Sequence, residues 1–401
     1  MNRPTTDADR AVTIERVAEQ ARAAGRIALD TEFMGEGRYR TLLCLIQLAV
    51  ADGDGGERIE ILDPLQSGFP GGPLASVLAD PHIEVVVHAG RQDIALLRRA
   101  LGCEARNVFD TQVAAGFLGV GAQCSYDTLL AEFLGVRLAK SASFTRWDAR
   151  PLSPEQVEYA RDDVVHLTAL ALELQRRLEE VGRLGWAREE CEFLEQVSDE
   201  RDLDTVFERL PRVRSMNPVS QGVARELAAW RERTAAERDR PVQSVLGDAA
   251  LVEIAKRKPT SSQKLEEIRG VGQNSLRKRG EELLAAIQQG LQRSHQPLAA
   301  GQRPTPPQPE DAPLIALSEA LVRARAREAN LAYELLASRA DLQAIVVARR
   351  ERTTGRDESG EADVRTLHGW RRELVGGELL AMLDGHVSLA VADGRLRVSS
   401  T

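Results

Sequence analysis

The feature that most constrains this chain is a short apolar segment that leads into two carboxylates. Residues 26–29, Arg-Ile-Ala-Leu, predict a buried strand, and Asp30 and Glu32 follow at its end. Side chains at positions i and i+2 of a strand point to the same face, about 6.6 Å apart along the chain. Two carboxylates placed in this way repel each other and resist removal from water. Either the strand end is frayed into solvent, or a cation offsets the two acids.

The first 200 residues alternate strand and helix patterns, which indicates an α/β domain. Strands that form a meander and then alternate with helices are typical of a mixed sheet covered by helices. A long helix is expected from about Pro154 to Arg177, after the capping signal Ser-Pro-Glu-Gln. Strands are expected at residues 26–30, 42–50, 58–63 and 83–89, and further helices at 71–81, 91–102 and 126–136.

Strand patterns nearly vanish after residue 200, and helical patterns replace them. With 401 residues the chain is long enough for two or three domains. A Pro-rich polar stretch at residues 294–313 has too few apolar residues to pack a core, so it predicts a linker. We therefore expect an α/β domain at 1–200 and all-α modules at 208–293 and 314–401, with a small hairpin in the tail at 386–400.

Charge is unevenly distributed along the chain, which bears on its partners. The net charge is −8, but residues 209–293 hold 17 Lys and Arg against 10 Asp and Glu. A basic module on an acidic body suggests binding to a polyanion, although a solvated Arg-rich surface gives the same count. Within this module the turn at 270–272 precedes Arg277, Lys278 and Arg279, which are candidate phosphate contacts.

The sequence gives no sign of a membrane-bound or secreted protein. No apolar run reaches 18 residues, and the first twenty residues are polar, so neither a transmembrane helix nor a secretory signal is expected. The four cysteines are scattered without a C-x-x-C pair, which argues against a disulfide framework and a structural zinc site. We expect a cytoplasmic protein with no membrane partner and no obligate protein partner.

Asp93 and His88 occupy the end of a second apolar strand. Residues 85–87 are all Val, His88 follows them, and Asp93 falls in the first turn of the next helix. An acid in this position also complements the helix dipole, and a histidine at a strand end is more often a hydrogen-bonding group than a catalyst. Each residue alone therefore has an ordinary structural interpretation.

Tyr159 and Asp163 form the third candidate place. They are four residues apart on an expected helix and so share a face. Asp162 and His166 form a second pair with the same spacing, and helical phase does not decide which pair faces a cleft.

Considered together, Asp30, Glu32, Asp93 and Asp163 indicate a metal site, with Tyr159 beside it. Oxygen-rich sites suit hard divalent cations such as Mg²⁺ or Mn²⁺. Two such ions about 3.5–4 Å apart can stabilise both the attacking and the leaving oxygen of a phosphodiester. Metal ions would explain why the chain tolerates acids next to buried segments.

Three motifs carry a resemblance to a known family. The strings DTEF at 30–33, HAGRQD at 88–93 and YARDD at 159–163 resemble the motifs of the DEDD 3′→5′ exonuclease superfamily, in its tyrosine branch. FDTQVAAGFLG, YDTLLAEFLGV and RWDARPLSPEQVEYARDDVVHL are similar to the ribonuclease D family. The resemblance covers about residues 10–200 and implies a ribonuclease H-like mixed sheet with flanking helices. The module at 208–293 resembles an HRDC domain, and the last block resembles a divergent second copy.

The resemblance implies a role for each motif residue. Asp30, Glu32 and Asp163 would hold the metal ion that activates water. Asp30 would also bind a second ion together with Asp93, and that ion would stabilise the leaving 3′ oxygen. Tyr159 would orient the attacking water or help to deprotonate it.

For three ring-bearing side chains near the motifs, the sequence leaves open whether they contact the substrate or serve a structural role. Phe33 either contacts the terminal base of a single strand or packs in the core. His88 is a candidate contact to the substrate backbone. Trp147 lies in a TRWD string that departs from the order common among relatives, and packing is the favoured role for it.

The predicted function is a 3′→5′ exoribonuclease that releases nucleoside 5′-monophosphates and trims structured RNA such as tRNA precursors. The HRDC modules would position RNA through phosphate contacts. A DNA 3′→5′ exonuclease is the alternative within the enzyme class, because such a site need not read the 2′-hydroxyl. A catalytically inert RNA-binding scaffold is the second alternative, and the complete set of acids speaks against it.

Overall fold

The computed structural model describes most of the chain. It covers residues 7–53, 55–121, 123–138, 146–293, 305–353 and 360–400, with the side chains of 7–11, 273–278 and 400 left out.

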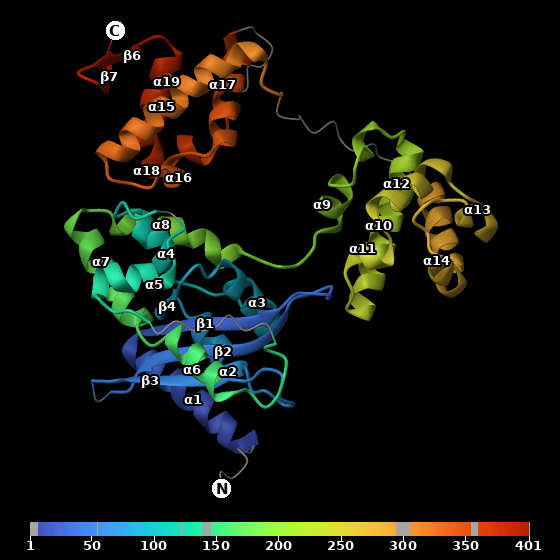
Figure 1. The fold of residues 1–401 in the computed structure, drawn as a ribbon, viewed down its shortest axis with the longest axis horizontal. Coiled ribbons are helices and arrows are strands. Elements are labelled where there is room, and N and C mark those ends of the chain that lie inside the picture. The colour runs from blue at the N-terminus through green and yellow to red at the C-terminus, as the bar shows by residue number, and fades with distance from the viewer. Residues whose placement is uncertain are drawn as a thin grey trace.

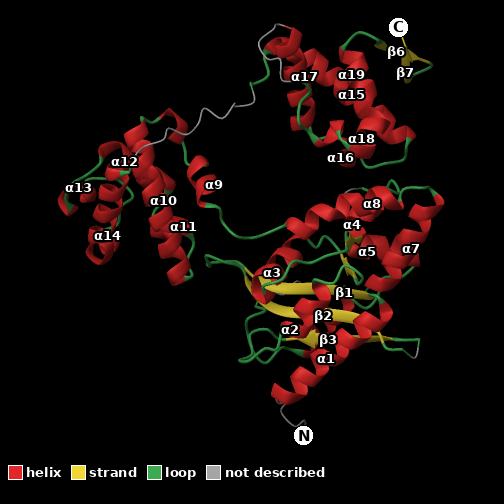
Figure 2. Ribbon diagram, turned by 180° about the vertical axis from the view of Figure 1, so that it is seen from behind, coloured by secondary structure: helices red, strands yellow, loops and turns green. Residues whose placement is uncertain are grey.

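A five-stranded mixed sheet forms the centre of the N-terminal half (Figure 2). The strand order is β3-β2-β1-β4-β5, with β1, β2 and β3 antiparallel and with β4 and β5 parallel to β1. The predicted mixed sheet is thereby confirmed. The strands are β1 (Arg26–Met34), β2 (Leu42–Ala51), β3 (Glu57–Leu62), β4 (Glu84–Val87) and β5 (Val108–Asp110).

Helices cover both faces of the sheet, because both faces are apolar. On one face, side chains such as Ile27 and Leu29 pack against α1 (Asp7–Ala24), α2 (Gly72–Leu78) and α3 (Arg91–Leu101). On the other face, Ala28 and Val86 pack against α7 (Leu167–Glu180). The remaining elements of this half are α4 (Thr111–Gly116), α5 (Tyr126–Leu129), η1 (Leu130–Leu134), α6 (Pro154–Asp162), α8 (Leu184–Cys191) and η2 (Glu192–Gln196).

Two local predictions are wrong in an informative way. The strand expected to end at Asp30 continues through Met34, with a register shift between Glu32 and Phe33, so both acids lie inside β1. The helix expected from Pro154 to Arg177 is two helices, α6 and α7, separated by a turn at residues 163–166. The break follows from local chemistry, because two consecutive acids oppose the dipole at a helix C-terminus and two valines lower helix propensity.

The rest of the chain is helical and falls into two blocks (Figure 1). The first block packs around its own apolar core. It comprises α9 (Leu203–Glu208), η3 (Val213–Ser215), α10 (Pro218–Arg238), α11 (Val242–Val245), α12 (Asp248–Arg257), α13 (Ser262–Glu266) and α14 (Gln273–Gln292).

The second block ends in the predicted hairpin, which is confirmed as β6 (Val387–Ala392) and β7 (Arg395–Ser400). Within the described chain, no helix is both long and apolar enough to cross a bilayer. The helical elements are η4 (Pro309–Asp311), α15 (Ala312–Glu328), α16 (Tyr333–Leu336), α17 (Arg339–Thr353), η5 (Arg365–Leu367), α18 (Gly369–Arg371), η6 (Arg372–Gly376) and α19 (Gly377–Leu383).

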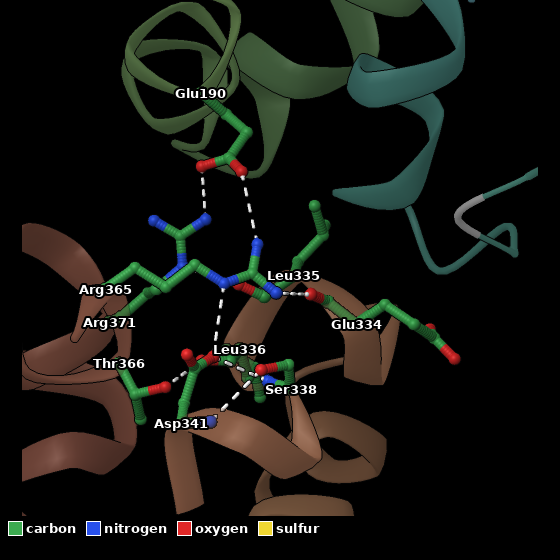
Figure 3. Close-up of polar contacts among 9 residues, drawn as sticks. All are labelled: Glu190, Glu334, Leu335, Leu336, Ser338, Asp341, Arg365, Thr366 and Arg371. Atoms are coloured by element: carbon green, nitrogen blue, oxygen red, sulfur yellow. Dashed lines mark hydrogen bonds and ion pairs between the residues drawn. The ribbon is translucent and has the colours of Figure 1, made fainter. Parts of the chain in front are cut away.

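The second helical block shares an apolar core with the sheet domain. Trp370 stacks on Trp186 of α8 and meets Phe117 edge-on, with ring centroids 5.1 Å apart in both pairs. Beside these rings, Glu190 of α8 faces Arg365 and Arg371 (Figure 3). The sheet domain and the last block are therefore one packed unit, although about 120 residues separate them in the sequence.

The first helical block meets the sheet domain through polar contacts. The loop between β1 and β2 reaches α10, where Arg38 pairs with Asp239 at 2.5 Å and the Tyr39 hydroxyl donates to Glu232 at 2.9 Å. Arg201 also lies near Glu232, at 3.4 Å. This contact attaches the first helical block to the loop that directly follows β1.

Arg371 and its neighbour Arg372 provide a matched test of the packed unit. The Arg371 guanidinium is buried, binds Glu190 and donates to the Leu335 carbonyl, whereas Arg372 pairs with Glu361 at the surface. We expect Arg371→Ala to lower the free energy of unfolding by about 2–4 kcal/mol, because the buried Leu335 carbonyl and the half-buried Glu190 both lose a donor. Arg372→Ala should lower it by less than about 1 kcal/mol. Equal losses in denaturant unfolding of the full chain would contradict this assignment.

Candidate active site

Three carboxylates meet above the middle of the sheet. Asp30 and Glu32 project from the same face of β1, and Asp163 lies at the C-terminal end of α6. One carboxylate oxygen from each residue lies within 4.8 Å of the other two. The fold thus brings Asp163 to two acids that precede it by 131 residues or more, and the three form one cluster.

Backbone hydrogen bonding in α6 fixes the position of Asp163. Ser153 and Gln156 form the capping box that begins the helix, as the sequence predicts. At the other end, the Asp163 amide donates to the Tyr159 carbonyl at 3.3 Å, so the last helical turn is complete. Tyr159 and Asp163 therefore share a face, and the helix break comes just after them.

Asp93 approaches the cluster from the other side of the sheet. It lies in the first turn of α3, is buried, and accepts a hydrogen bond from the Thr31 hydroxyl. Its carboxylate lies outside the group of three, yet its charge raises the pKa of both Asp30 and Glu32. The structure thus brings three of the predicted ligands together and places the fourth beside them.

Asp110 holds the turn that carries Asp93, and the sequence analysis missed it. The buried Asp110 carboxylate accepts hydrogen bonds from the amides of Ala89 and Gly90 and also caps α4. A Cβ at Gly90 would lie 2.4 Å from a Val87 methyl group, so only glycine fits there. The signal was present in the string Val-Phe-Asp-Thr, because an Asp-Thr pair after an apolar strand is typical of a helix cap.

Burial and mutual repulsion make the carboxylic acids of the cluster harder to ionise, so their pKa values are raised. Burial, followed by the charges of Asp163 and Asp93, raises the pKa of Glu32 to about 8. Burial, followed by the neighbouring Asp162, raises the pKa of Asp163 to about 7, and burial raises that of Asp93 to about 6. The pKa of Asp30 is raised well above its usual value, first by burial and then by the other acids. Each carboxylate would therefore gain from a nearby cation.

The donor set fits hard divalent cations. Among the described residues, no Lys or Arg forms an ion pair with Asp30, Glu32, Asp93 or Asp163. Carboxylate oxygens are the ligands that Mg²⁺ and Mn²⁺ prefer. The side chains that would hold such ions are Asp30, Glu32 and Asp163, with Asp93 next to them.

Tyr159 stands beside the acids with its hydroxyl protonated. Burial, followed by the charges of Asp163, Glu32 and Asp30, raises its pKa to about 12. Its ring packs against Trp147, with centroids 5.9 Å apart, and Trp147 is buried. The predicted packing role of Trp147 therefore matches its position, and Trp147 orients the tyrosine ring.

Phe33 and His88 occupy contrasting environments. Phe33 is 38% exposed, just after the register shift in β1, so it does not pack in the core. His88 is largely buried, and its Nδ1 lies 2.9 Å from the Thr111 hydroxyl oxygen. Its ring packs against the Tyr126 ring, with the two centroids 5.5 Å apart. Burial lowers its pKa. Contact of either residue with substrate stays a prediction, and it fits the exposed Phe33 better.

Of the three basic residues of α14 predicted to contact phosphate, the structure describes the side chain of Arg279 alone. The side chains of Arg277 and Lys278 fall outside the described part of the chain. The Arg279 side chain is only 11% exposed and lies 3.9 Å from Glu282. A guanidinium in this position is turned into the helical block.

Fold and site together define a 3′→5′ exonuclease that depends on divalent metal ions. A family model described as 3′-5′ exonuclease matches residues 6–179, which include all four acids and Tyr159. A second family model, for the HRDC domain, matches residues 220–287 in the first helical block. A second HRDC copy in the last block stays a prediction.

Full-length relatives narrow this class to one family. A ribonuclease D of Granulibacter bethesdensis is 36% identical over 379 residues, which is 94% of this chain and 91% of that protein. A ribonuclease D of Gluconacetobacter diazotrophicus is 36% identical over 389 residues, with 95% and 93% covered. The crystal structure of Escherichia coli RNase D, an exoribonuclease, aligns with a TM-score of 0.75 at 28% identity, covering 96% of this chain and all of that one. The chain belongs to the ribonuclease D family of 3′→5′ exoribonucleases.

The raised pKa values predict how the metal-free protein responds to pH. A carboxyl whose pKa is higher in the folded chain binds more protons there, so the free energy of unfolding falls as pH rises between the two values. For Glu32 this interval runs from 4.5 to about 8, and for Asp163 from 3.8 to about 7. In EDTA the protein should therefore lose stability between about pH 5 and pH 8, and Mg²⁺ should restore more stability at pH 8 than at pH 6.

Asp30→Asn tests the same repulsion directly. In EDTA at pH 8 it should raise the free energy of unfolding by about 1–2 kcal/mol, because a buried acid whose ionisation is opposed by burial and by three other acids is replaced by a neutral amide. It should also abolish most of the stabilisation by Mg²⁺. The exposed Glu180→Gln serves as the control and should change neither quantity by more than about 0.5 kcal/mol. A destabilised Asp30→Asn in EDTA would contradict the prediction. Calorimetric unfolding measures all of these values.

Proposed function

We propose that Asp30, Glu32, Asp93 and Asp163 hold two divalent cations, Mg²⁺ or Mn²⁺, at which the terminal phosphodiester of an RNA is hydrolysed. The observation that supports this most strongly is the meeting of three carboxylates within 4.8 Å without a compensating cation among the described side chains. The bound ions supply charge that activates water and stabilises the leaving 3′ oxygen. The products are nucleoside 5′-monophosphates, released one at a time.

Each acid has a distinct position relative to the substrate. Asp30, whose charge is opposed by all three other acids, would contribute to holding both ions. Glu32 and Asp163 would hold one ion together with Asp30, and Asp93 on α3 would help to hold the other. The hydrogen bond from Thr31 holds the Asp93 carboxylate in place.

Tyr159 orients the attacking water. With a pKa near 12, its hydroxyl keeps its proton at neutral pH and acts as a hydrogen-bond donor or acceptor rather than as an anion. The exposed Phe33 lies one residue beyond Glu32 on the same strand, where it can stack on the terminal base.

We propose structured RNA such as tRNA precursors as the substrate. The Escherichia coli relative is an exoribonuclease involved in structured RNA processing. We assign residues 1–200 to the exonuclease domain, 208–293 to an HRDC domain, 294–313 to a linker and 314–401 to a divergent second HRDC domain. The basic charge of the first helical block would provide phosphate contacts, so RNA affinity should fall with salt.

The four free cysteines suit a reducing cytoplasm.

Asp163 and Asp162 allow a sharp test of the active site. On a 3′-extended tRNA precursor labelled at its 5′ end, Asp163→Asn should lower the rate at least about 100-fold, because a metal ligand is lost. Asp162→Asn should keep the rate within about threefold, because that acid acts on Asp163 only through its charge. A ladder that shortens from the 3′ end, with loss of activity in EDTA, is the expected pattern. Digestion of the matching DNA alone would indicate a DNA exonuclease, and retained RNA binding without digestion would indicate a scaffold.

Tyr159→Phe separates water positioning from ring packing. The variant keeps the ring against Trp147 and removes only the hydroxyl. We expect kcat to fall about 10–100-fold while KM for RNA stays within about threefold. Trp147→Phe is the companion variant, in which a smaller ring should lower kcat less. Full activity of Tyr159→Phe in steady-state assays would remove the tyrosine from the mechanism.

A further inference from the structure

Gln47 carries a fully buried amide in the middle of β2. The residue has no exposed surface, and neither its Nε2 nor its Oε1 has a hydrogen-bond partner among the described residues. An amide buried without partners costs roughly 1–3 kcal/mol. An apolar residue of the same size would suit this position better if packing were its only role.

The strand pairing places this amide beside the catalytic cluster. Gln47 is the direct partner of Asp30 in the antiparallel pair of β1 and β2. Directly opposed residues project from the same face, with Cβ atoms about 4.5–5.5 Å apart. On that face, the neighbours of Gln47 along β2 are Leu45 and Ala49, and its partner on β3 is Ile61. Asp30 is thus the polar residue directly opposite the amide, and Glu32, which pairs with Leu45, lies diagonally across from it.

We propose that Gln47 is a positioning residue for Asp30, to whose carboxylate its Nε2 donates a hydrogen bond when metal ions are bound. This inference rests on the proposed function, in which Asp30 is the ligand that both ions share. A carboxylate accepts hydrogen bonds through two oxygens, so one lone pair can take the amide proton while the others face the ions. The hydrogen bond fixes the orientation of the carboxylate and gives the buried amide its missing partner.

Side chains that hydrogen-bond to a metal-binding carboxylate affect both metal affinity and activity. Loss of such a partner typically weakens metal binding about 10–100-fold. Gln47 acts through Asp30 and does not touch the substrate, so its loss should change metal affinity and kcat while RNA binding stays the same.

Gln175 provides a matched control in the same layer of the structure. It is a buried glutamine of α7, but its amide already donates to Glu84 at 2.8 Å and accepts from Arg26 at 3.0 Å. Replacement of Gln175 therefore breaks structural hydrogen bonds without touching the acids of the site.

The experiment compares Gln47→Met, Gln175→Met and Asp30→Asn in the full chain. The readouts are unfolding in EDTA, Mn²⁺ affinity by calorimetry on the metal-free protein, and kcat and KM on a 3′-extended RNA. We expect Gln47→Met to be at least as stable as wild type in EDTA, to bind Mn²⁺ about 10–100-fold more weakly, and to lose kcat with KM within about threefold. Gln175→Met should lose stability and keep its Mn²⁺ affinity within about twofold.

Two results separate failure of this inference from failure of the proposed function. Wild-type Mn²⁺ affinity in Gln47→Met, alongside weak binding in Asp30→Asn, would overturn the role of Gln47 alone. Unchanged Mn²⁺ affinity in Asp30→Asn would overturn the metal site itself. If Gln47→Met does not fold, Gln47→Asn replaces it, because its shorter amide is withdrawn from Asp30. Wild-type Mn²⁺ affinity in Gln47→Asn would likewise overturn the inference.

Discussion

Repulsion among carboxylates on the central strand is the constraint on which the rest of the structure depends. Asp30 and Glu32 lie inside β1, where a hydrophobic sheet and two helical layers remove most of the surrounding water. The fold meets this repulsion with rigid supports rather than with local cations. The capping box and last turn of α6 fix Asp163, and the Asp110 carboxylate fixes the turn before Asp93. The apolar framework holds the acids together, so packing energy maintains a cluster that electrostatics alone would push apart.

The sequence was sufficient to predict that Asp30, Glu32 and Asp163 come together, but not the local geometry of the segments that carry them. Spacing of i and i+2 on a strand brought Asp30 and Glu32 to one face, and spacing of i and i+4 did the same for Tyr159 and Asp163. The sequence pattern does not reveal the helix break after Asp163, because apolar periodicity continues through Val164 and Leu167, both of which are fully buried. Periodicity reports which side chains are buried, and it does not detect a change in helix direction that keeps them buried.

Local sequence patterns could not predict the features of the site that depend on contacts between residues far apart in the chain. The bond from Thr31 to Asp93 and the pairing of Gln47 with Asp30 arise only when strands and helices meet. One glutamine within an apolar strand is compatible with an exposed edge, so the sequence pattern does not single out Gln47. Only the structure shows that Gln47 is fully buried and lies opposite Asp30.

The polar and apolar attachments of the two helical blocks have different mechanical consequences. The first block is attached through Arg38 and Tyr39 on the loop after β1, so a force on that block acts near the strand that carries the acids. The last block instead buries Trp370 against Phe117 and Trp186 of the sheet domain. A chain cut after residue 200 would present these aromatic side chains to water. The apolar core around the sheet is therefore discontinuous in sequence, and the first helical block lies between its two parts along the chain.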